Sequence, residues 1–275
     1  MAELETVYLT LPASTDDLRK LKIGTVAYLS GRVFTAREGV YKRAIEDGAG
    51  MPAGRDALGL ANFHCSPAAS VNPDGSYTVG AVTATASFRF AQWLDGWFKL
   101  SGCNVIIGKG GMTSEIYRRS FVPNRAIYLT TVGYGTGALL GRGIKQVAGV
   151  YWLEELGLAQ AVWVLDVEKF GPFLVESDLA GNSLFERENA KIAPGLEKLY
   201  AGTKPATLRR YGETDDKTEE VICGCVAVRR LSCARSRCRY GARRRRMRAS
   251  RYFHCKEQSI SNELPPATRV ASMPA

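Results

Sequence analysis

Cysteine and histidine are both scarce in the first four fifths of this 275-residue chain. Residues 1–220 hold only two of the seven cysteines, Cys65 and Cys103, and a single histidine, His64. Two widely spaced thiols can build neither a disulfide framework nor a complete set of ligands for a metal cluster. The histidine lacks the neighbouring pattern of a catalytic triad, so we expect it to pack or to form hydrogen bonds in the interior.

Long apolar runs are also missing. No stretch approaches the ~18 uncharged apolar residues that a membrane-spanning helix needs. The N-terminal sequence Met-Ala-Glu-Leu-Glu is acidic and is not a secretory signal. We therefore expect a cytoplasmic protein without a membrane contact, whose length allows one large domain or two small ones.

Positive charge is confined to the C-terminal part of the chain. The net charge is +10, yet residues 221–275 alone carry thirteen Lys and Arg against two acids, which leaves residues 1–220 close to neutral. Eleven of these arginines lie between Arg229 and Arg251, where large aliphatic residues are almost absent. Such a segment cannot bury enough apolar area to offset the entropy lost on ordering. We predict a folded domain at 1–220 and a disordered Arg-rich tail at 221–275, whose abrupt onset suggests an altered reading frame or a splice product.

Strand and helix patterns alternate along the folded part. Strands are expected at 26–30, 32–35, 77–82, 105–107, 126–132, 161–167 and 173–176. Helices are expected at 15–21, 37–47, 86–100, 136–147 and 194–200. Residues 48–76 are rich in Pro, Gly, Asn and Asp and predict a long loop. The alternation indicates the α/β class, with a mixed central sheet flanked by helices.

Three expected strand ends are each followed by one cation among small or hydroxyl residues. Arg37 follows the second strand, Arg89 lies in a first helical turn after Thr-Ala-Thr-Ala-Ser, and Lys109 stands in Gly-Lys-Gly-Gly. Helix N-termini favour anions, and arginine and lysine bind carboxylates. A lone Arg at a helix start is more often a surface contact, but ligands of open α/β sheets gather at the carboxyl ends of strands. Together the three loops predict a small substrate with more than one carboxylate.

A series of longer segments carries a family resemblance. They are Leu-Ser-Gly-Arg-Val-Phe-Thr-Ala-Arg (29–37), Asn-Phe-His-Cys-Ser-Pro (62–67), Thr-Ala-Ser-Phe-Arg (85–89), Ile-Ile-Gly-Lys-Gly-Gly-Met (106–112), Val-Tyr-Trp-Leu-Glu-Glu-Leu-Gly (150–157) and the run from Phe170 to Leu184. In order and spacing the chain resembles the β subunit of L(+)-tartrate dehydratase and the C-terminal domain of class I fumarase.

The resemblance implies the β subunit of an iron–sulfur hydro-lyase with a swivelling β/α domain. It implies that a partner α subunit holds a [4Fe–4S] cluster through three cysteines, in a hetero-oligomer of the α2β2 type. Carried over by position, Arg37, Arg89 and Lys109 would bind the carboxylates of a dicarboxylate substrate. Thr85 would take part in moving the C3 proton, and a carboxylate of the partner would have to activate its hydroxyl.

Two motifs depart from the family pattern. The usual Arg-Asp-x-x-His is Arg37-Glu38-Gly39-Val40-Tyr41, and the usual Gly-Pro-Thr-Thr-x-x-Arg is Thr83-Ala84-Thr85-Ala86-Ser87-Phe88-Arg89. Fumarate/malate, tartrate/oxaloacetate and a methylated homologue therefore stay open as substrates. The alternative function is a non-catalytic, degenerate hydro-lyase domain whose basic tail binds nucleic acid.

Overall fold

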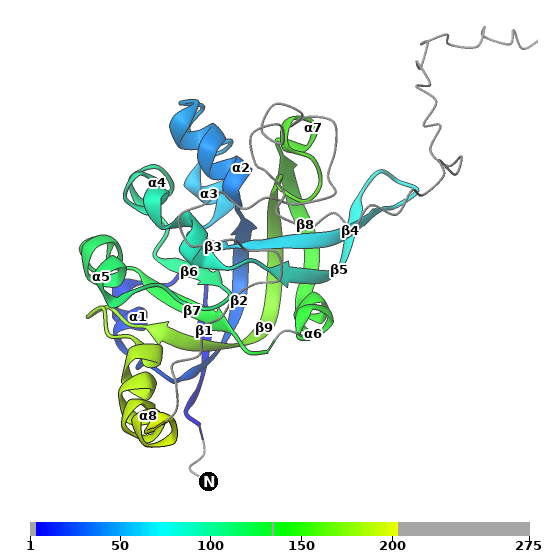
Figure 1. Cartoon of the computed structure of the whole chain (residues 1–275). Helices are drawn as coiled ribbons and strands as arrows, with labels where there is room; N and C mark the ends of the chain where they lie inside the picture. Colours follow the sequence, from blue (N-terminus) through cyan, green and yellow to red (C-terminus); the bar gives the residue numbers. More distant parts are fainter. Residues whose placement is uncertain (1–3, 134, 203–275) are drawn as a thin grey trace, which may run out of the picture. The chain divides into compact units, whose positions relative to one another are not determined.

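A mixed sheet of seven strands forms the centre of the computed structural model, which describes residues 4–133 and 135–202. The strand order is β1-β2-β3-β6-β7-β9-β8. Their bounds are β1 (Thr6–Thr10), β2 (Val26–Thr35), β3 (Ala61–Phe63), β6 (Val105–Gly108), β7 (Ile127–Thr131), β8 (Ile144–Tyr151) and β9 (Val162–Ser177). The first five in this order are parallel, and β9 runs antiparallel to β7, β2 and β8 (Figure 1). The predicted α/β class with a mixed sheet is confirmed.

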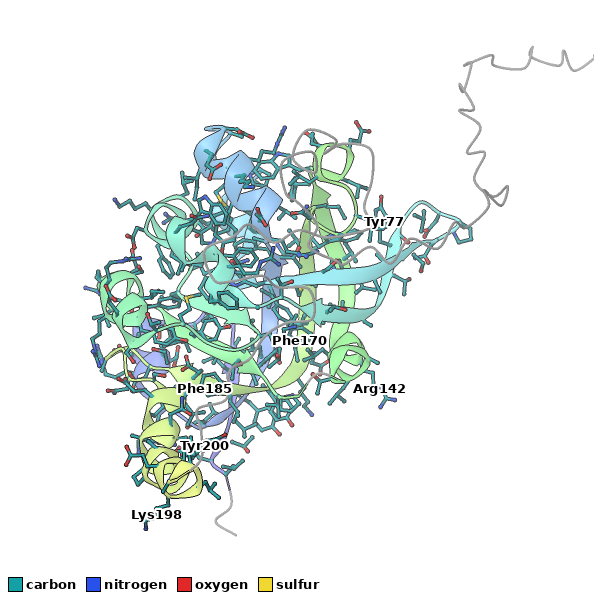
Figure 2. The ribbon with its side chains drawn as sticks, viewed as in Figure 1. Tyr77, Arg142, Phe170, Phe185, Lys198 and Tyr200 are labelled. Atoms are coloured by element: carbon teal, nitrogen blue, oxygen red, sulfur yellow. The ribbon has the colours of Figure 1, made fainter. Side chains whose placement is uncertain are left out.

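The long strand β9 closes part of this sheet on itself. Phe173 and Leu174 pair with β2 on one side and with β7 on the other. The strands β2, β3, β6, β7 and β9 therefore form a ring, and alternate side chains point into it. The buried apolar residues of this interior include Ala27, Leu29, Val105, Ile107, Ile127, Leu129 and Phe170, the last labelled in Figure 2.

A second core lies on the outer face of the same strands, under a layer of helices. Phe34, Ile106 and Tyr128 point to this side, away from the ring interior. The covering segments are α2 (Glu38–Tyr41) with a π-helical turn (Lys42–Glu46), a 3-10 segment (Ser87–Trp93) that runs into α4 (Leu94–Ser101), and α5 (Ser114–Ile116) with a second π-helical turn (Tyr117–Phe121). Tyr41 and Trp97 pack within this core with tilted rings, at 4.4 Å between ring centroids.

The other elements surround the ring. A two-stranded sheet is made by β4 (Cys65–Val71) and β5 (Tyr77–Ala84), with Tyr77 labelled in Figure 2. Shorter helices are α1 (Thr15–Arg19), α3 (Arg55–Leu58), a 3-10 turn (Val122–Asn124), α6 (Gly137–Arg142) and α7 (Leu153–Leu156), and the last helix is α8 (Leu184–Tyr200). No helix in the described ranges is long and apolar enough to cross a bilayer.

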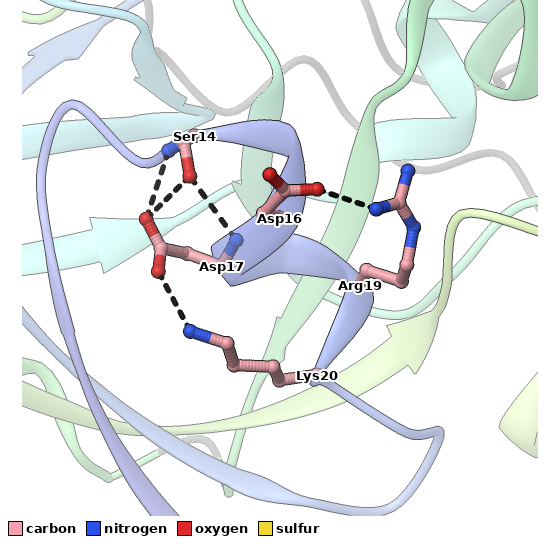
Figure 3. A network of polar contacts seen from close by, with 5 residues as sticks. All are labelled: Ser14, Asp16, Asp17, Arg19 and Lys20. Atoms are coloured by element: carbon pink, nitrogen blue, oxygen red, sulfur yellow. Dashed lines mark hydrogen bonds and ion pairs between the residues drawn. The ribbon is translucent and has the colours of Figure 1, made fainter.

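Helix α1 shows how local sequence fixes an element. Ser14 accepts a hydrogen bond from the Asp17 N–H at 3.2 Å, and Asp17 accepts one in return from the Ser14 N–H at 3.2 Å (Figure 3). Ion pairs of Asp16 with Arg19 and of Asp17 with Lys20 complete the turn. This reciprocal pair is a capping box, so the helix predicted from residue 15 begins where expected.

The predicted loop and several predicted element boundaries differ from the structure. Residues 48–76 are not one loop, because they contain α3, β3 and β4. The helix predicted at 136–147 ends at Arg142. The residues from Ile144 form the strand β8 instead, because they pair with β9. The two strands predicted on either side of Gly171-Pro172 are the single strand β9, with a register shift at that point.

The last helix and the second strand also extend further than predicted. Helix α8 begins at Leu184 rather than at 194, and Pro194 lies inside it. The strand β2 runs through Gly31, whose φ of +124° and close approach to the Leu11 carbonyl oxygen leave no room for a Cβ atom. The domain boundary predicted at 220/221 and the tail beyond it lie outside the described residues.

Candidate active site at the carboxyl edge of the parallel strands

Backbone geometry brings Thr85 and Lys109 side by side. Lys109 follows the last residue of β6, and Thr85 follows the last residue of β5. The Lys109 N–H donates to the Thr85 carbonyl at 3.2 Å, and the Thr85 N–H donates to the His64 carbonyl at 2.6 Å. His64 in turn donates its N–H to the Ile107 carbonyl at 2.8 Å. The segment after β5 therefore lies across the carboxyl ends of β3 and β6.

Glu38 connects the segments of Arg37 and Arg89, because it follows Arg37 in the chain and its carboxylate pairs with Arg89. Arg37 is the N-cap residue of α2, directly after β2, and its guanidinium donates to the Ala159 carbonyl at 3.2 Å. Arg89 donates to Glu38 Oε2 at 3.2 Å. The pKa of Glu38 is lowered mainly by the hydrogen bond and charge of Lys42, and to a smaller extent by the charges of Arg89 and Arg37. Arg89 thus already pairs with a carboxylate, whose other oxygen bonds Lys42 at 2.7 Å.

All four residues predicted for the site therefore lie at one edge of the sheet. Arg37 and Lys109 follow parallel strands, and Thr85 and Arg89 belong to one short segment between them. The edge is open to solvent, since the Arg89 side chain is 50% exposed and Phe88 beside it is 63% exposed. Two surface cavities of about 670 and 690 Å³ lie elsewhere, and none of the four residues lines them.

Glu38 also belongs to this edge, although the sequence marked it only as a departure from the family pattern. The residue type was visible in the sequence, because Glu38 follows Arg37 at the position where the family carries Asp. Its contact with Arg89, 51 residues away, was not visible. Only the folded arrangement of α2 against the 3-10 segment produces that ion pair.

A chain of buried polar side chains lies beneath the edge and was also missed. The His64 ring nitrogens lie 2.7 Å from the Ser87 hydroxyl and 2.7 Å from the Tyr41 hydroxyl. Tyr128 donates to the Ser87 hydroxyl at 2.7 Å, and Tyr41 donates to Asn62 Oδ1 at 3.1 Å. The expectation that His64 is an interior hydrogen-bonding residue is confirmed, because it is fully buried.

Burial controls the ionisation of these hydrogen-bonded side chains. Burial lowers the pKa of His64 from 6.5 to about 3, so the imidazole is neutral at physiological pH. Burial also raises the pKa of Tyr41 and of Tyr128, which keeps both phenols protonated. The network therefore carries no charge of its own under the cations of the edge.

The described residues do not fit the ligand set of a metal cluster. Cys65 and Cys103 are both buried. Burial raises the pKa of both thiols, that of Cys103 to about 12, which disfavours the thiolate that a metal needs. Across residues 4–133 and 135–202, no group of three His, Cys, Asp or Glu side chains is placed to hold a metal ion. The ligands of any iron–sulfur cluster would have to come from outside this part of the chain.

The fold is an α/β domain with three cationic residues at the carboxyl ends of its parallel strands, where open α/β sheets bind ligands. The sequence profile of the family described as fumarase C-terminus matches residues 1–188. The chain therefore belongs to the fumarase C-terminal family, whose relatives below carry the names of hydro-lyases.

Three relatives illustrate the range of that family. The provisionally named L(+)-tartrate dehydratase subunit beta of Methanocaldococcus jannaschii is 35% identical over 188 residues, which cover 66% of this chain and 93% of the relative. The L(+)-tartrate dehydratase subunit beta of Escherichia coli K12 is 30% identical over 67% of this chain and 88% of its own length. A provisionally named class I fumarate hydratase of Geobacillus stearothermophilus is 29% identical over 74% of this chain, but the match covers only 38% of that longer protein. The match therefore covers most of the length of the β subunits but only part of the longer fumarate hydratase. The enzyme class that these relatives share is hydro-lyase.

Proposed function

We propose that this chain is the β subunit of a [4Fe–4S]-dependent hydro-lyase that adds water to, or removes it from, a small dicarboxylate. The substrate pairs that fit this chemistry are fumarate/malate and tartrate/oxaloacetate. The observation that carries the proposal is the grouping of three cations at one edge of the sheet. Arg89 pairs with the carboxylate of Glu38, the residue after Arg37, and Lys109 is joined to Thr85 by a backbone hydrogen bond. A dicarboxylate could replace Glu38 at Arg89 and extend its second carboxylate towards Lys109.

The chain's own residues would supply binding and proton transfer. In this proposal, Arg37, Arg89 and Lys109 hold the substrate carboxylates and stabilise the negative charge that develops on them during the reaction. The half-buried Thr85 hydroxyl moves the C3 proton, and a carboxylate of the partner must activate it, because an unaided hydroxyl is a poor base. The cluster, when bound, supplies a Lewis acid for the substrate hydroxyl.

The described residues leave a role for a partner subunit. The cationic edge is open, and the described cysteines do not fit cluster ligation. We therefore propose an α subunit that carries the cluster and closes over the edge, in a cytoplasmic hetero-oligomer of the α2β2 type. The ring closed by β9 would then be the swivelling β/α domain that moves against that partner.

The test is anaerobic reconstitution with the cluster-bearing α subunit from the same genome. We expect hydration of fumarate, or dehydration of malate or L(+)-tartrate, that neither subunit performs alone. Absence of turnover with every dicarboxylate tried, despite a loaded cluster and a stable complex, would refute the proposal.

A further inference from the structure

The buried chain under the edge has one internally consistent direction of hydrogen bonding. The Asn62 amide nitrogen donates to the Phe34 carbonyl at 3.4 Å, which turns Asn62 Oδ1 towards Tyr41. Because that oxygen can only accept, the Tyr41 hydroxyl must donate its single hydrogen to it. Tyr41 can then only accept from His64 Nε2, so the proton of the neutral imidazole lies on Nε2.

The other ring nitrogen is consequently an acceptor. His64 Nδ1 has no proton in this tautomer, so the Ser87 hydroxyl at 2.7 Å must donate to it. Ser87 is left to accept, and Tyr128 donates to it at 2.7 Å. Tyr128, Ser87, His64 and Tyr41 therefore each donate one hydrogen bond to the next group. All of them except Tyr128 also accept one from the group before. The Ser87 proton is therefore committed to His64 and is not available for substrate.

Gly108, the residue before Lys109, leaves room for this hydrogen-bonded network. A Cβ atom on Gly108 would overlap the Ser87 hydroxyl and lie 2.7 Å from the Tyr128 hydroxyl. Ser87 itself is fully buried, and its N–H donates to the Lys109 carbonyl at 3.2 Å. The Ser87 side chain thus fixes the segment that carries Thr85 and Arg89, two residues away on either side.

We propose that His64 is the positioning residue of the site: through Ser87 it holds the Thr85–Arg89 segment in register with Lys109. The backbone of His64 receives the Thr85 N–H, and its imidazole receives the Ser87 hydroxyl, so both ends of Thr85-Ala86-Ser87 are attached to one residue. The positioning of the segment is a property of this chain, and its effect on turnover rests on the proposed function.

Two substitutions of His64 separate positioning from simple packing. The amide oxygen of His64→Asn falls near the place of Nδ1 and can still accept from Ser87, whereas that of His64→Gln falls near Nε2 and cannot. We expect His64→Gln and Ser87→Ala to lower kcat of the reconstituted complex at least tenfold, with His64→Asn within about threefold of the parent. The matched control is Ser101→Ala, which removes another buried serine hydroxyl, bonded to the Trp97 carbonyl at 2.8 Å, and should leave kcat within twofold.

A second readout on the full chain does not depend on turnover. Hydrogen exchange of the Thr85 and Ser87 amides should accelerate at least tenfold in His64→Gln and Ser87→Ala, and not in Ser101→Ala. If the two amides exchange as in the parent, or if His64→Asn and His64→Gln behave alike in kcat and exchange, the positioning role is overturned. Faster exchange together with no turnover of the parent complex would instead keep the positioning role and reject the proposed reaction.

Discussion

At the scale of single residues, His64 should make stability depend on pH. Its ordinary pKa of 6.5 falls to about 3 on burial, so below pH 6.5 the unfolded chain binds a proton that the folded chain does not. The free energy of unfolding is therefore lowered progressively between pH 6.5 and about 3, and is unaffected above that window. Between pH 7 and pH 5 the loss from this residue should be about 2 kcal/mol.

The measurement is urea unfolding of the full chain at pH 7 and pH 5, followed by far-UV circular dichroism. His64→Gln cannot titrate, so its own loss over that interval should be smaller by about 2 kcal/mol. Equal pH dependence in the two proteins would show that His64 is accessible to protons in the folded state.

The positions of the candidate site residues could be read from the sequence, whereas the hydrogen bonds beneath them could not. Arg37, Arg89 and Lys109 could be proposed from the sequence because each follows a strand end closely, where charge and backbone N–H groups coincide. The Ser87–His64–Tyr41 bonds were not predictable, because they join residues 23 positions apart through the packing of two layers. A polar side chain buried by tertiary contacts leaves no periodic signal in the sequence.

At the scale of elements, two serine N-caps should contribute very differently to stability. Ser14 caps the exposed start of α1, whereas Ser183 caps α8 and also donates at 2.7 Å to Oε1 of Glu176, which is fully buried. Burial already raises the pKa of Glu176, so the loss of a donor leaves a buried carboxyl group less satisfied. We expect Ser14→Ala to cost about 1 kcal/mol and Ser183→Ala about 2–4 kcal/mol.

Urea unfolding of the two variants at pH 7 gives the comparison. The matched chemistry of the two substitutions means that any difference comes from the burial of the second hydroxyl. Costs that agree within 0.5 kcal/mol, a margin taken from the usual scatter of such measurements, would argue against a structural role for the Ser183–Glu176 contact.

The element scale also shows why some of the fold was predicted and some was not. The strands β6 and β7 were predicted because they are continuous apolar runs buried on both faces. The three-residue strand β3 was hidden among turn-forming residues, and β8 was concealed by a local helical pattern. The start of α8 was marked by Ser183 three residues before Glu186, a cap signal that the internal Pro194 outweighed in the sequence.

At the scale of the whole molecule, the charge distribution predicts a separation of functions. Residues 221–275 carry the excess positive charge, and the rest of the chain is near neutral. A chain cut after residue 220 should keep the turnover of the reconstituted complex within twofold, because the cationic edge lies wholly between residues 37 and 109. Any nucleic-acid binding of the full chain should be steeply salt-dependent and should disappear in the truncated chain.

Titration of a fluorescent single-stranded oligonucleotide at 50 and 200 mM salt, beside the activity assay, separates the two functions. Tail-dependent binding in a protein without turnover on any dicarboxylate would favour the alternative, a degenerate domain that associates with nucleic acid. Loss of turnover on truncation would mean that the tail takes part in the enzyme.

The most direct test of the account compares kcat/KM of two arginine variants in the complex reconstituted with its α subunit. Arg89 and Arg119 are alike in exposure, at 50% and 52%, and each is paired with one carboxylate, but only Arg89 lies at the cationic edge. Arg89→Lys should lower kcat/KM at least tenfold, because lysine loses the two-pronged contact with a substrate carboxylate, and Arg119→Lys should leave it unchanged. Equal kcat/KM values for the two variants would contradict a dicarboxylate site at the carboxyl edge.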